Sequence, residues 1–169
     1  MTTIVAGTNR SGSNTKKIAL AYQRLLEERG VATHFFSLEG EQVWNRDARL
    51  REIEEKIILP TSQFIFIVPE YNGSFPGVLK MLFDNSSSHE IWYHKKALLT
   101  GLATGRAGNL RGMDHLADIL NFVKITVHPN KLPLSQVNRL IDAGGRISDP
   151  GTLAAIRQQL DEFLSWIKY

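Results

Sequence analysis

A polar loop near the N-terminus, residues 7–15, lies between an apolar run and an amphipathic stretch. Residues 3–6 carry no charge and end at Gly7, which is typical of a strand that is buried on both faces of a sheet. From residue 14 to residue 29 the apolar side chains recur with helical spacing, and Gly30 then supplies a stop. A buried strand, a polar loop and an amphipathic helix in this order predict a parallel α/β unit.

The same alternation continues to the end of the chain. Further strands are expected over residues 33–38, 63–68, 96–101 and 124–127. Helices are expected within residues 43–59, 76–83, 113–123 and 152–167, and residues 131–137 are expected to be an extended excursion. The segment 63–68 is β-branched and aromatic almost throughout, so it is expected near the centre of the sheet.

This pattern predicts the fold class. Strands that alternate with helices form a parallel sheet covered on both faces, with right-handed crossovers. We expect a single α/β domain over residues 1–169, a flavodoxin-like three-layer sandwich whose five-stranded parallel sheet has the order 2-1-3-4-5. Ligands of such sheets bind at the carboxyl ends of the strands, beside the switch point between strands 1 and 3. The loops after strands 1, 3 and 4 open at that edge.

Composition excludes several classes of function. The chain has 169 residues, enough for one sizeable core, and no cysteine, which excludes thiol catalysis, thiolate metal sites and disulfides. A net charge of +3 without a long basic run does not indicate a nucleic-acid partner, although it suits anionic small ligands. No apolar run has the length of a membrane span, so we expect a cytoplasmic protein with no membrane partner.

The loop over residues 7–15 has the composition of an anion site. Its hydroxyl, amide and guanidinium groups gather at the start of a helix, where backbone N–H groups and the helix dipole favour negative charge. They belong to Thr8, Asn9, Arg10, Ser11, Ser13 and Asn14. An ordinary polar loop with a Ser or Asn helix cap explains the same residues equally well.

Two common nucleotide motifs are absent. Gly7 and Gly12 have the spacing of a P-loop, but Ser13 and Asn14 stand where that motif requires Lys and then Ser or Thr. Without the lysine no group reaches the β- and γ-phosphates, and no G-x-G-x-x-G occurs in the chain. A hydroxyl-rich loop with one arginine suits a terminal phosphomonoester, which is the group that an FMN site must bind.

Two longer motifs carry a resemblance to a known family. The first is Gly7-Thr8-Asn9-Arg10-x-x-Ser13. The second, longer and more distinctive, is Pro69-Glu70-Tyr71-Asn72-Gly73-Ser74-x-Pro76-Gly77-x-Leu79-Lys80. Together they resemble the NADPH-dependent FMN reductase family, which includes flavin-dependent quinone, azo-dye and chromate reductases. The spacing of the two motifs agrees with the family, and the resemblance covers nearly the whole chain.

The resemblance implies a cofactor site at the three loops. In the family the first loop binds the ribityl phosphate of FMN, the second lies along the isoalloxazine, and the turn after strand 4 approaches the other edge of the ring. By resemblance the phosphate is held by Thr8, Arg10, Ser11, Ser13, Asn14 and Thr15. The ring is held by Pro69, Glu70, Tyr71, Asn72 and Gly73, and the site is closed by Ala103, Thr104, Gly105 and Arg106.

Three positions depart from the family pattern. Met81 stands where the family usually has Asn, and Ala103-Thr104-Gly105-Arg106 replaces a turn that is often Gly-Gly. Ser13-Asn14-Thr15 replaces the usual Ser-x-Asn, which still leaves hydrogen-bonding groups. The change in the turn bears on contacts to the pyrimidine ring and on the electron acceptor.

The implied function is an FMN-dependent oxidoreductase that takes hydride from NADPH or NADH and reduces a quinone-, flavin- or azo-type acceptor in a ping-pong cycle. The resemblance also implies a homodimer or homotetramer. Transfer to flavin N5 needs no side-chain acid or base, so no catalytic residue is assigned, and the spacing of the histidines indicates no metal site. A flavodoxin-like FMN electron carrier without NAD(P)H turnover is the alternative, and a non-catalytic phosphate-binding module is a third possibility.

Overall fold

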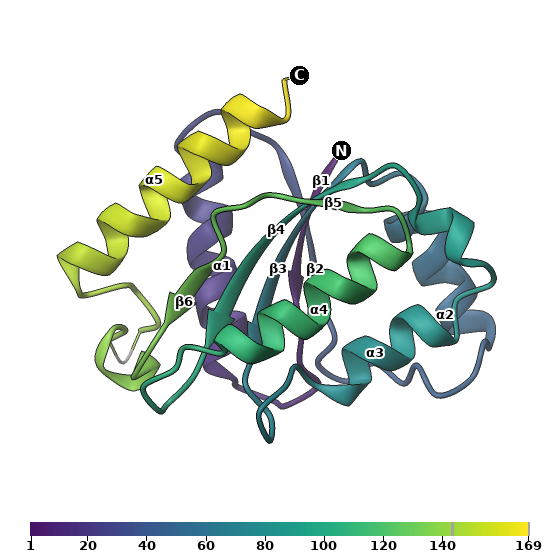
Figure 1. Ribbon diagram of the computed structural model, residues 1–169, viewed down its shortest axis with the longest axis horizontal. Helices are drawn as coiled ribbons and strands as arrows, with labels where there is room; N and C mark the ends of the chain where they lie inside the picture. The colour runs from purple at the N-terminus through teal and green to yellow at the C-terminus, as the bar shows by residue number, and fades with distance from the viewer. Residues whose placement is uncertain (143, 169) are drawn as a thin grey trace.

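The computed structural model describes residues 1–142 and 144–168 and has the predicted alternation of strands and helices (Figure 1). The strands are β1 (Thr2–Ala6), β2 (Thr33–Ser37), β3 (Gln63–Pro69), β4 (Lys96–Leu102), β5 (Thr126–Val127) and β6 (Leu132–Leu134). The helices are α1 (Asn14–Glu27), α2 (Ala48–Ile53), α3 (Gly77–Asp84), α4 (Leu110–Phe122) and α5 (Pro150–Trp166). A π-helical turn, Glu54–Ile58, continues α2, and short 3₁₀ turns cover His89–Trp92 and Val137–Arg139.

The sheet has the order β2-β1-β3-β4-β5, and each of these pairs is parallel. The predicted flavodoxin-like topology is therefore confirmed, with β3 at the centre as its composition indicates. Among the described residues, no helix combines the length and the apolar character needed to cross a membrane.

The sheet has one strand more than the sequence predicts, because its last position is filled by two short strands. β5 pairs only with Lys96 and Ala97 at the start of β4. The carboxyl half of β4 is left open, and β6 pairs there with residues Thr100 to Leu102. β6 lies in the expected excursion over residues 131–137 and is three residues long, too short for an alternating pattern to reveal. Its proline is tolerated because β6 is an edge strand.

The helices cover both faces of the sheet (Figure 1). One core cluster joins the sheet to α2, α3 and α4, and the other joins it to α1 and α5. Successive residues of β3 alternate between the two, since Phe64 and Phe66 belong to the first and Ile65 and Ile67 to the second. This arrangement explains why the central strand has no polar face: both of its sides are core.

Capping residues fix where the helices begin. Ser13 accepts a hydrogen bond from the backbone N–H of Lys16 at 3.2 Å and starts α1 beside the end of β1. Asp149 accepts from the N–H of Thr152 at 2.7 Å and starts α5, with Pro150 in its first turn. The Ser13 cap presents the N-terminus of α1 at the carboxyl edge of the sheet.

Three loops meet at that edge, as the topology requires. They are the β1–α1 loop (residues 7–13), the β3–α3 loop (residues 70–76) and the β4–α4 turn (residues 103–109). The ends of the three strands are in register, because Ala6 pairs with Ile67 and Pro69 pairs with Leu102. The loops are therefore neighbours although they are far apart in the sequence.

Candidate functional site

A cleft with two adjoining hollows opens among these loops. The hollows share Glu70, Ala103 and Thr104, and their volumes are about 240 Å³ and about 270 Å³. Every residue predicted to bind the cofactor lines one of them, with the single exception of Thr8. The first hollow is lined by the predicted phosphate residues Arg10, Ser11, Ser13, Asn14 and Thr15. The second hollow is lined by Asn72, Gly73, Gly105 and Arg106.

The end of the first hollow at the β1–α1 loop is rich in hydrogen-bond donors. Ser13 caps α1 there, and the helix contributes its positive end together with the hydroxyl group of Thr15. Asn14 donates through Nδ2 to Oδ1 of Asn138 at 2.6 Å, which ties the helix start to the segment after β6. This donor set fits a phosphate group.

Glu39 holds the outer side of the β1–α1 loop. Its carboxylate accepts from Lys16 Nζ at 2.7 Å and from the N–H of Gly12 at 3.3 Å. Hydrogen bonds from Lys16 and then from Ser11 lower the pKa of Glu39. Gly12 has φ +62°, a conformation that glycine adopts without strain, so the carboxylate and the glycine together fix the tip of the loop.

The structure places Thr8 beneath the cleft. Its side chain is 1% exposed, and its hydroxyl oxygen lies 2.6 Å from the hydroxyl of Tyr71. The backbone N–H of Thr8 is also used, because it donates to the carbonyl of Ala6 at 3.0 Å. Thr8 therefore contacts the β3–α3 loop, not the hollow.

Arg10 and Tyr71 also meet across the two loops. The Cζ atom of the Arg10 guanidinium lies 4.2 Å from the centroid of the Tyr71 ring, which is within cation–π range. Within the described parts of the chain, no ion pair involves Arg10 or Arg106, the two arginines that line the cleft. Both guanidinium groups are available to an anionic ligand.

The β3–α3 loop begins with a two-residue hairpin. The N–H of Tyr71 donates to the carbonyl of Ser74 at 2.8 Å, and the N–H of Ser74 donates back at 3.1 Å. Asn72 and Gly73 between them have φ values of 52° and 79°, the pattern of a type I′ turn, for which Asn-Gly is the preferred pair. The N–H of Glu70 donates to Leu102 at 2.8 Å and anchors the hairpin to β4. The hairpin thus forms a narrow, rigid wall of the second hollow.

The opposite wall is the β4–α4 turn, which the segment after β6 holds in place. The N–H groups of Gln136 and Val137 donate to the carbonyls of Gly105 and Ala103 at 2.8 and 3.0 Å. Asn109 at the end of the turn donates through Nδ2 to the carbonyl of Val68 at 3.0 Å and so connects the turn to β3. α4 follows directly, which directs its positive end toward the cleft.

Three further residues line the cleft that the sequence motifs do not predict. Leu102 and Val137 line the first hollow, and Ala107 lines the second. Leu102 directly follows the strand predicted over residues 96–101, and it is the last residue of β4 in the structure. Val137 comes from the segment after β6, more than 30 residues from the nearest family motif, and no local pattern marks it.

The cleft therefore has a polar end and a carbon-rich middle. Donors gather around the start of α1, while Leu102, Ala103 and Val137 supply aliphatic surface farther along. A ligand with a phosphate at one end and a flat ring at the other matches this order, so the residues present fit FMN. Within the described residues, no group of three or more His, Asp or Glu side chains is placed to hold a metal ion.

Comparisons with known proteins agree with this geometry. A family model described as NADPH-dependent FMN reductase matches residues 2–139. The chain is 30% identical to an NAD(P)H-dependent FMN reductase of Pseudomonas aeruginosa, covering 97% of this chain and 93% of that protein. It is 23% identical to a 2-hydroxy-1,4-benzoquinone reductase of a Burkholderia species, covering 98% and 94%.

A solved structure has the same fold. The flavoenzyme NAD(P)H:(acceptor) oxidoreductase FerB of Paracoccus denitrificans superposes with a TM-score of 0.81, with 23% identity over 99% of this chain and 96% of that one. The likeness extends over the whole sheet and its flanking helices, including the edge where the cleft opens. The chain belongs to the NADPH-dependent FMN reductase family.

Proposed function

We propose that this protein binds FMN in the cleft and uses NAD(P)H to reduce a quinone-type acceptor. The FMN phosphate binds at the β1–α1 loop, and the ring lies between the hairpin at Tyr71–Ser74 and the β4–α4 turn. The observation that supports this orientation is the order of the lining groups, with donors at the start of α1 and aliphatic side chains beyond them. Residues 1–169 act together as one FMN-binding domain.

The residues of the cleft bind FMN and orient it toward the nicotinamide and the acceptor. Hydride transfer does not require them to donate or accept protons. FMN, when bound, supplies the hydride chemistry between the nicotinamide and the acceptor. The N-terminus of α4 and the Arg106 guanidinium provide positive charge near the second hollow, which favours a reduced, more negative ring. Glu70 lines both hollows, and its backbone N–H bond to Leu102 supports a role in holding the wall.

Membership of the family and the names of the relatives favour turnover with NAD(P)H over simple electron carriage. The quinone acceptor is proposed because one relative is a 2-hydroxy-1,4-benzoquinone reductase. Because the open cleft can admit donor and acceptor in turn, we expect a ping-pong cycle. We also place the protein in the cytoplasm, where its nicotinamide donor is regenerated.

The proposed function is tested with purified protein. We expect a yellow protein, or one that takes up FMN from solution, and we expect NADPH or NADH to bleach the flavin band under argon. Steady-state oxidation of NADPH and NADH is then measured with a panel of quinones, azo dyes and free flavin. Parallel lines in double-reciprocal plots support the ping-pong cycle. Bound flavin without NAD(P)H oxidation identifies the electron-carrier alternative, and a colourless protein that cannot be reconstituted contradicts the proposal.

We further propose that the protein forms a homodimer, or a homotetramer built from such pairs, through α3 and α4. Three large apolar side chains are exposed on or beside this face: Met81 at 37%, Leu110 at 51% and Phe122 at 78%. A hollow of about 510 Å³ between the two helices includes Phe83, Ile119 and Phe122 in its lining. Figure 1 shows that α3 and α4 lie side by side on one face. Several large apolar side chains exposed on two neighbouring helices are typical of an interface.

Light scattering after size exclusion tests the dimer. Wild type should elute with at least twice the chain mass, and Phe122→Asp should shift the equilibrium toward the monomer. Leu59→Asp is the matched control, since Leu59 is also exposed, at 53%, but ends the π-helical turn that follows α2. A monomeric wild type at micromolar concentration contradicts this part of the proposal.

A further inference from the structure

Two side chains of the β1–α1 loop hold Tyr71 from different directions. The Thr8 hydroxyl lies 2.6 Å from the Tyr71 hydroxyl, and the Arg10 guanidinium lies 4.2 Å from the centre of the Tyr71 ring. The backbone N–H of Arg10 donates to the same Thr8 oxygen at 3.3 Å. Thr8, Arg10 and Tyr71 therefore form one connected unit across residues that are 63 positions apart in the sequence.

The contacts that Tyr71 makes with Thr8 and with Arg10 differ in their exposure to water. Thr8 is buried and Tyr71 is half-buried, so the hydrogen bond between them is shielded from water. Arg10 is exposed, and both Arg10 and Tyr71 line the first hollow. The Tyr71 hydroxyl is engaged by the buried hydroxyl of Thr8, so we assign it to this contact and not to a substrate. What remains for Tyr71 to offer the cleft is its ring and its main chain.

We infer that Tyr71 is a positioning residue that couples the phosphate end of the cleft to the ring end. The inference rests on the proposed function, because it assumes that the two loops hold opposite ends of one FMN molecule. The Thr8–Tyr71 hydrogen bond fixes the distance between the loops before the ligand arrives. The stacked ring fixes the guanidinium of Arg10 above the same hollow as Ser11 and Ser13.

The physical consequence is preorganisation. A ligand that contacts two independent loops loses binding free energy because each loop must be ordered separately. Loops that are already joined are ordered before the ligand binds, so this entropic cost is smaller. The coupling therefore strengthens binding of a molecule that reaches both loops. It does little for a ligand that reaches one loop only, because the contacts of each loop are unchanged. FMN is the first kind of ligand, and riboflavin, which lacks the phosphate, is the second.

A double-mutant cycle tests the coupling. Tyr71→Phe removes the hydroxyl and keeps the ring on which Arg10 stacks, and Thr8→Val removes the other hydroxyl in the same volume. Each variant should weaken FMN binding about fivefold, the value of one hydrogen bond. The double variant should be no weaker than either single variant, because both remove the same bond. The dissociation constants are measured by quenching of flavin fluorescence on apoprotein.

Riboflavin provides the readout that a merely structural role would not give. Its dissociation constant should stay within about twofold in all three variants, because riboflavin lacks the phosphate and does not span both loops. Thr8→Ser, which keeps a hydroxyl, should restore FMN binding. Tyr93→Phe and Thr126→Val are matched controls at the opposite end of β4, and both should bind FMN as wild type does.

The outcomes are distinguishable from failure of the proposed function. If wild type does not bind FMN, the proposed function falls and the inference falls with it. If wild type binds FMN while the single variants match it, or if the two effects add in the double variant, the inference alone is overturned. An equal loss of riboflavin affinity also overturns it, since Tyr71 would then contact the ring directly. Thermal unfolding of each apoprotein identifies a variant that does not fold, and the other single variant then carries the test through its separate effects on FMN and riboflavin.

Discussion

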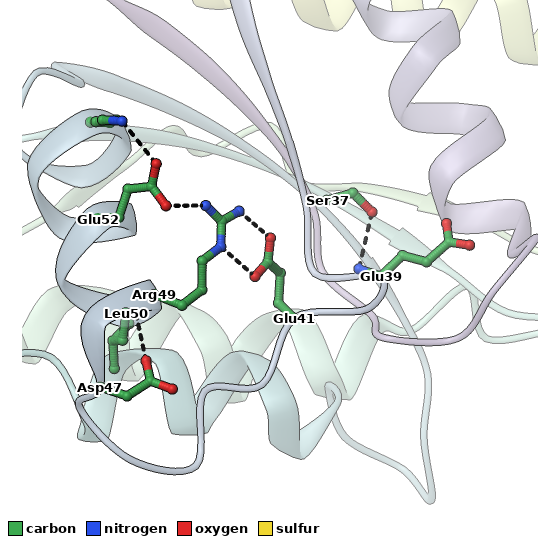
Figure 2. A network of polar contacts seen from close by, with 8 residues as sticks. Ser37, Glu39, Glu41, Asp47, Arg49, Leu50 and Glu52 are labelled. Carbon is green, nitrogen blue, oxygen red and sulfur yellow. Dashed lines mark hydrogen bonds and ion pairs between the residues drawn. The ribbon is translucent and has the colours of Figure 1, made fainter.

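Charged side chains are arranged differently in two regions of this molecule. Beside β2 and α2, Arg49 donates to Glu41 through Nε at 2.9 Å and through Nη2 at 2.5 Å, and to Glu52 through Nη1 at 2.7 Å (Figure 2). Lys56 adds a bond to Glu52 at 2.8 Å. At the cleft, neither Arg10 nor Arg106 has a carboxylate partner among the residues that the structure describes.

The two regions use their charged side chains for different purposes. Exposed ion pairs contribute little stability, so the network around Arg49 is not what holds α2 to the sheet. The effect of the network is to neutralise the positive charge of Arg49. Hydrogen bonds from Arg49 to Glu41 and then to Glu52 raise the pKa of Arg49, and the paired guanidinium is not available to bind an anionic ligand. The cleft keeps its arginines without such partners, which leaves their charge for a ligand.

Backbone geometry follows the same division. The hairpin at the cleft uses two residues with positive φ, and the β4–α4 turn is packed so closely that a Cβ at Gly101 would overlap the carbonyl oxygen of Gly108. The start of α2 needs no such backbone conformation. A side-chain cap begins this helix, in which Asp47 accepts a hydrogen bond from the N–H of Leu50 at 2.9 Å (Figure 2). Close backbone packing at the cleft is therefore more sensitive to substitution than the side-chain cap of α2.

Gly101→Ala should have the largest effect. The new Cβ meets backbone at Gly108, which cannot rotate away, so the β4–α4 turn must shift. We expect a loss of about 2–3 kcal/mol in the free energy of unfolding, together with weaker FMN binding. Urea unfolding followed by circular dichroism measures the first. Gly77→Ala is the matched control, because no heavy atom lies within 4 Å of its Cβ position. Equal stability of the two variants would show that the turn is not closely packed.

Glu54→Ala tests whether the region around α2 supports stability without affecting the cleft. Glu54 is 3% exposed, and its carboxylate accepts from Arg46 at 2.9 Å and from the N–H of Ser87 at 2.6 Å. Removing it leaves a partly buried N–H without an acceptor, which should cost about 2 kcal/mol of unfolding free energy. FMN affinity should be unchanged, since these residues lie away from the cleft. A drop in FMN affinity at constant stability would contradict the division drawn here.

The fold was accessible from the sequence because its signals are local. Residues 64–68 are all β-branched or aromatic, and helical spacing of apolar residues marks the segments between the strands, so strand order and layers follow from general rules. β6 was not accessible, because three residues carry no periodicity and its pairing with β4 depends on how short β5 is. The π-helical turn after α2 was also missed, since helical spacing does not distinguish it from α-helix.

The candidate site shows the same limit. Every predicted residue except Thr8 lines the cleft, because motif residues at the ends of adjacent parallel strands necessarily converge. Thr8 departs from this because its partner, Tyr71, lies on another loop, and no local pattern encodes a contact between them. Val137 was missed for the same reason. The roles of the predicted cleft residues in FMN binding remain predictions, which the binding measurements on variants will test.

Arg10→Ala tests whether this arginine of the cleft binds the phosphate of FMN. Arg10 lines the first hollow without a carboxylate partner, so its loss should weaken FMN binding by about 1.5–3 kcal/mol, the value of one charge-assisted hydrogen bond. The free energy of unfolding should hardly change, because Arg10 is exposed. Arg49→Ala is the matched control and should leave FMN affinity intact. An FMN dissociation constant that Arg10→Ala leaves unaltered would remove Arg10 from the phosphate site.

The smallest expected effect is a pH dependence at His128, a buried residue of the scaffold. Its ring packs edge-on against Phe163 and Trp166, and its Nδ1 accepts from the N–H of Asn130 at 3.3 Å. Burial lowers the pKa of His128, and the nearby carboxylate of Glu162 only partly opposes this. The neutral ring is the form that fits, because a protonated Nδ1 can no longer accept.

The sign of the effect follows from that lowered pKa. In the unfolded chain a histidine titrates near its ordinary value of about 6.5, so the stability that neutral His128 provides is complete above that pH. It is lost as the pH falls below about 6.5 toward the lower pKa of the folded state, because the unfolded chain then binds the proton more readily. Urea unfolding at pH 8, 7, 6 and 5.5 should show a smaller decline for His128→Phe than for wild type. The exposed His115, changed to Gln, is the control; identical declines in wild type and His128→Phe would show that His128 does not titrate differently on folding.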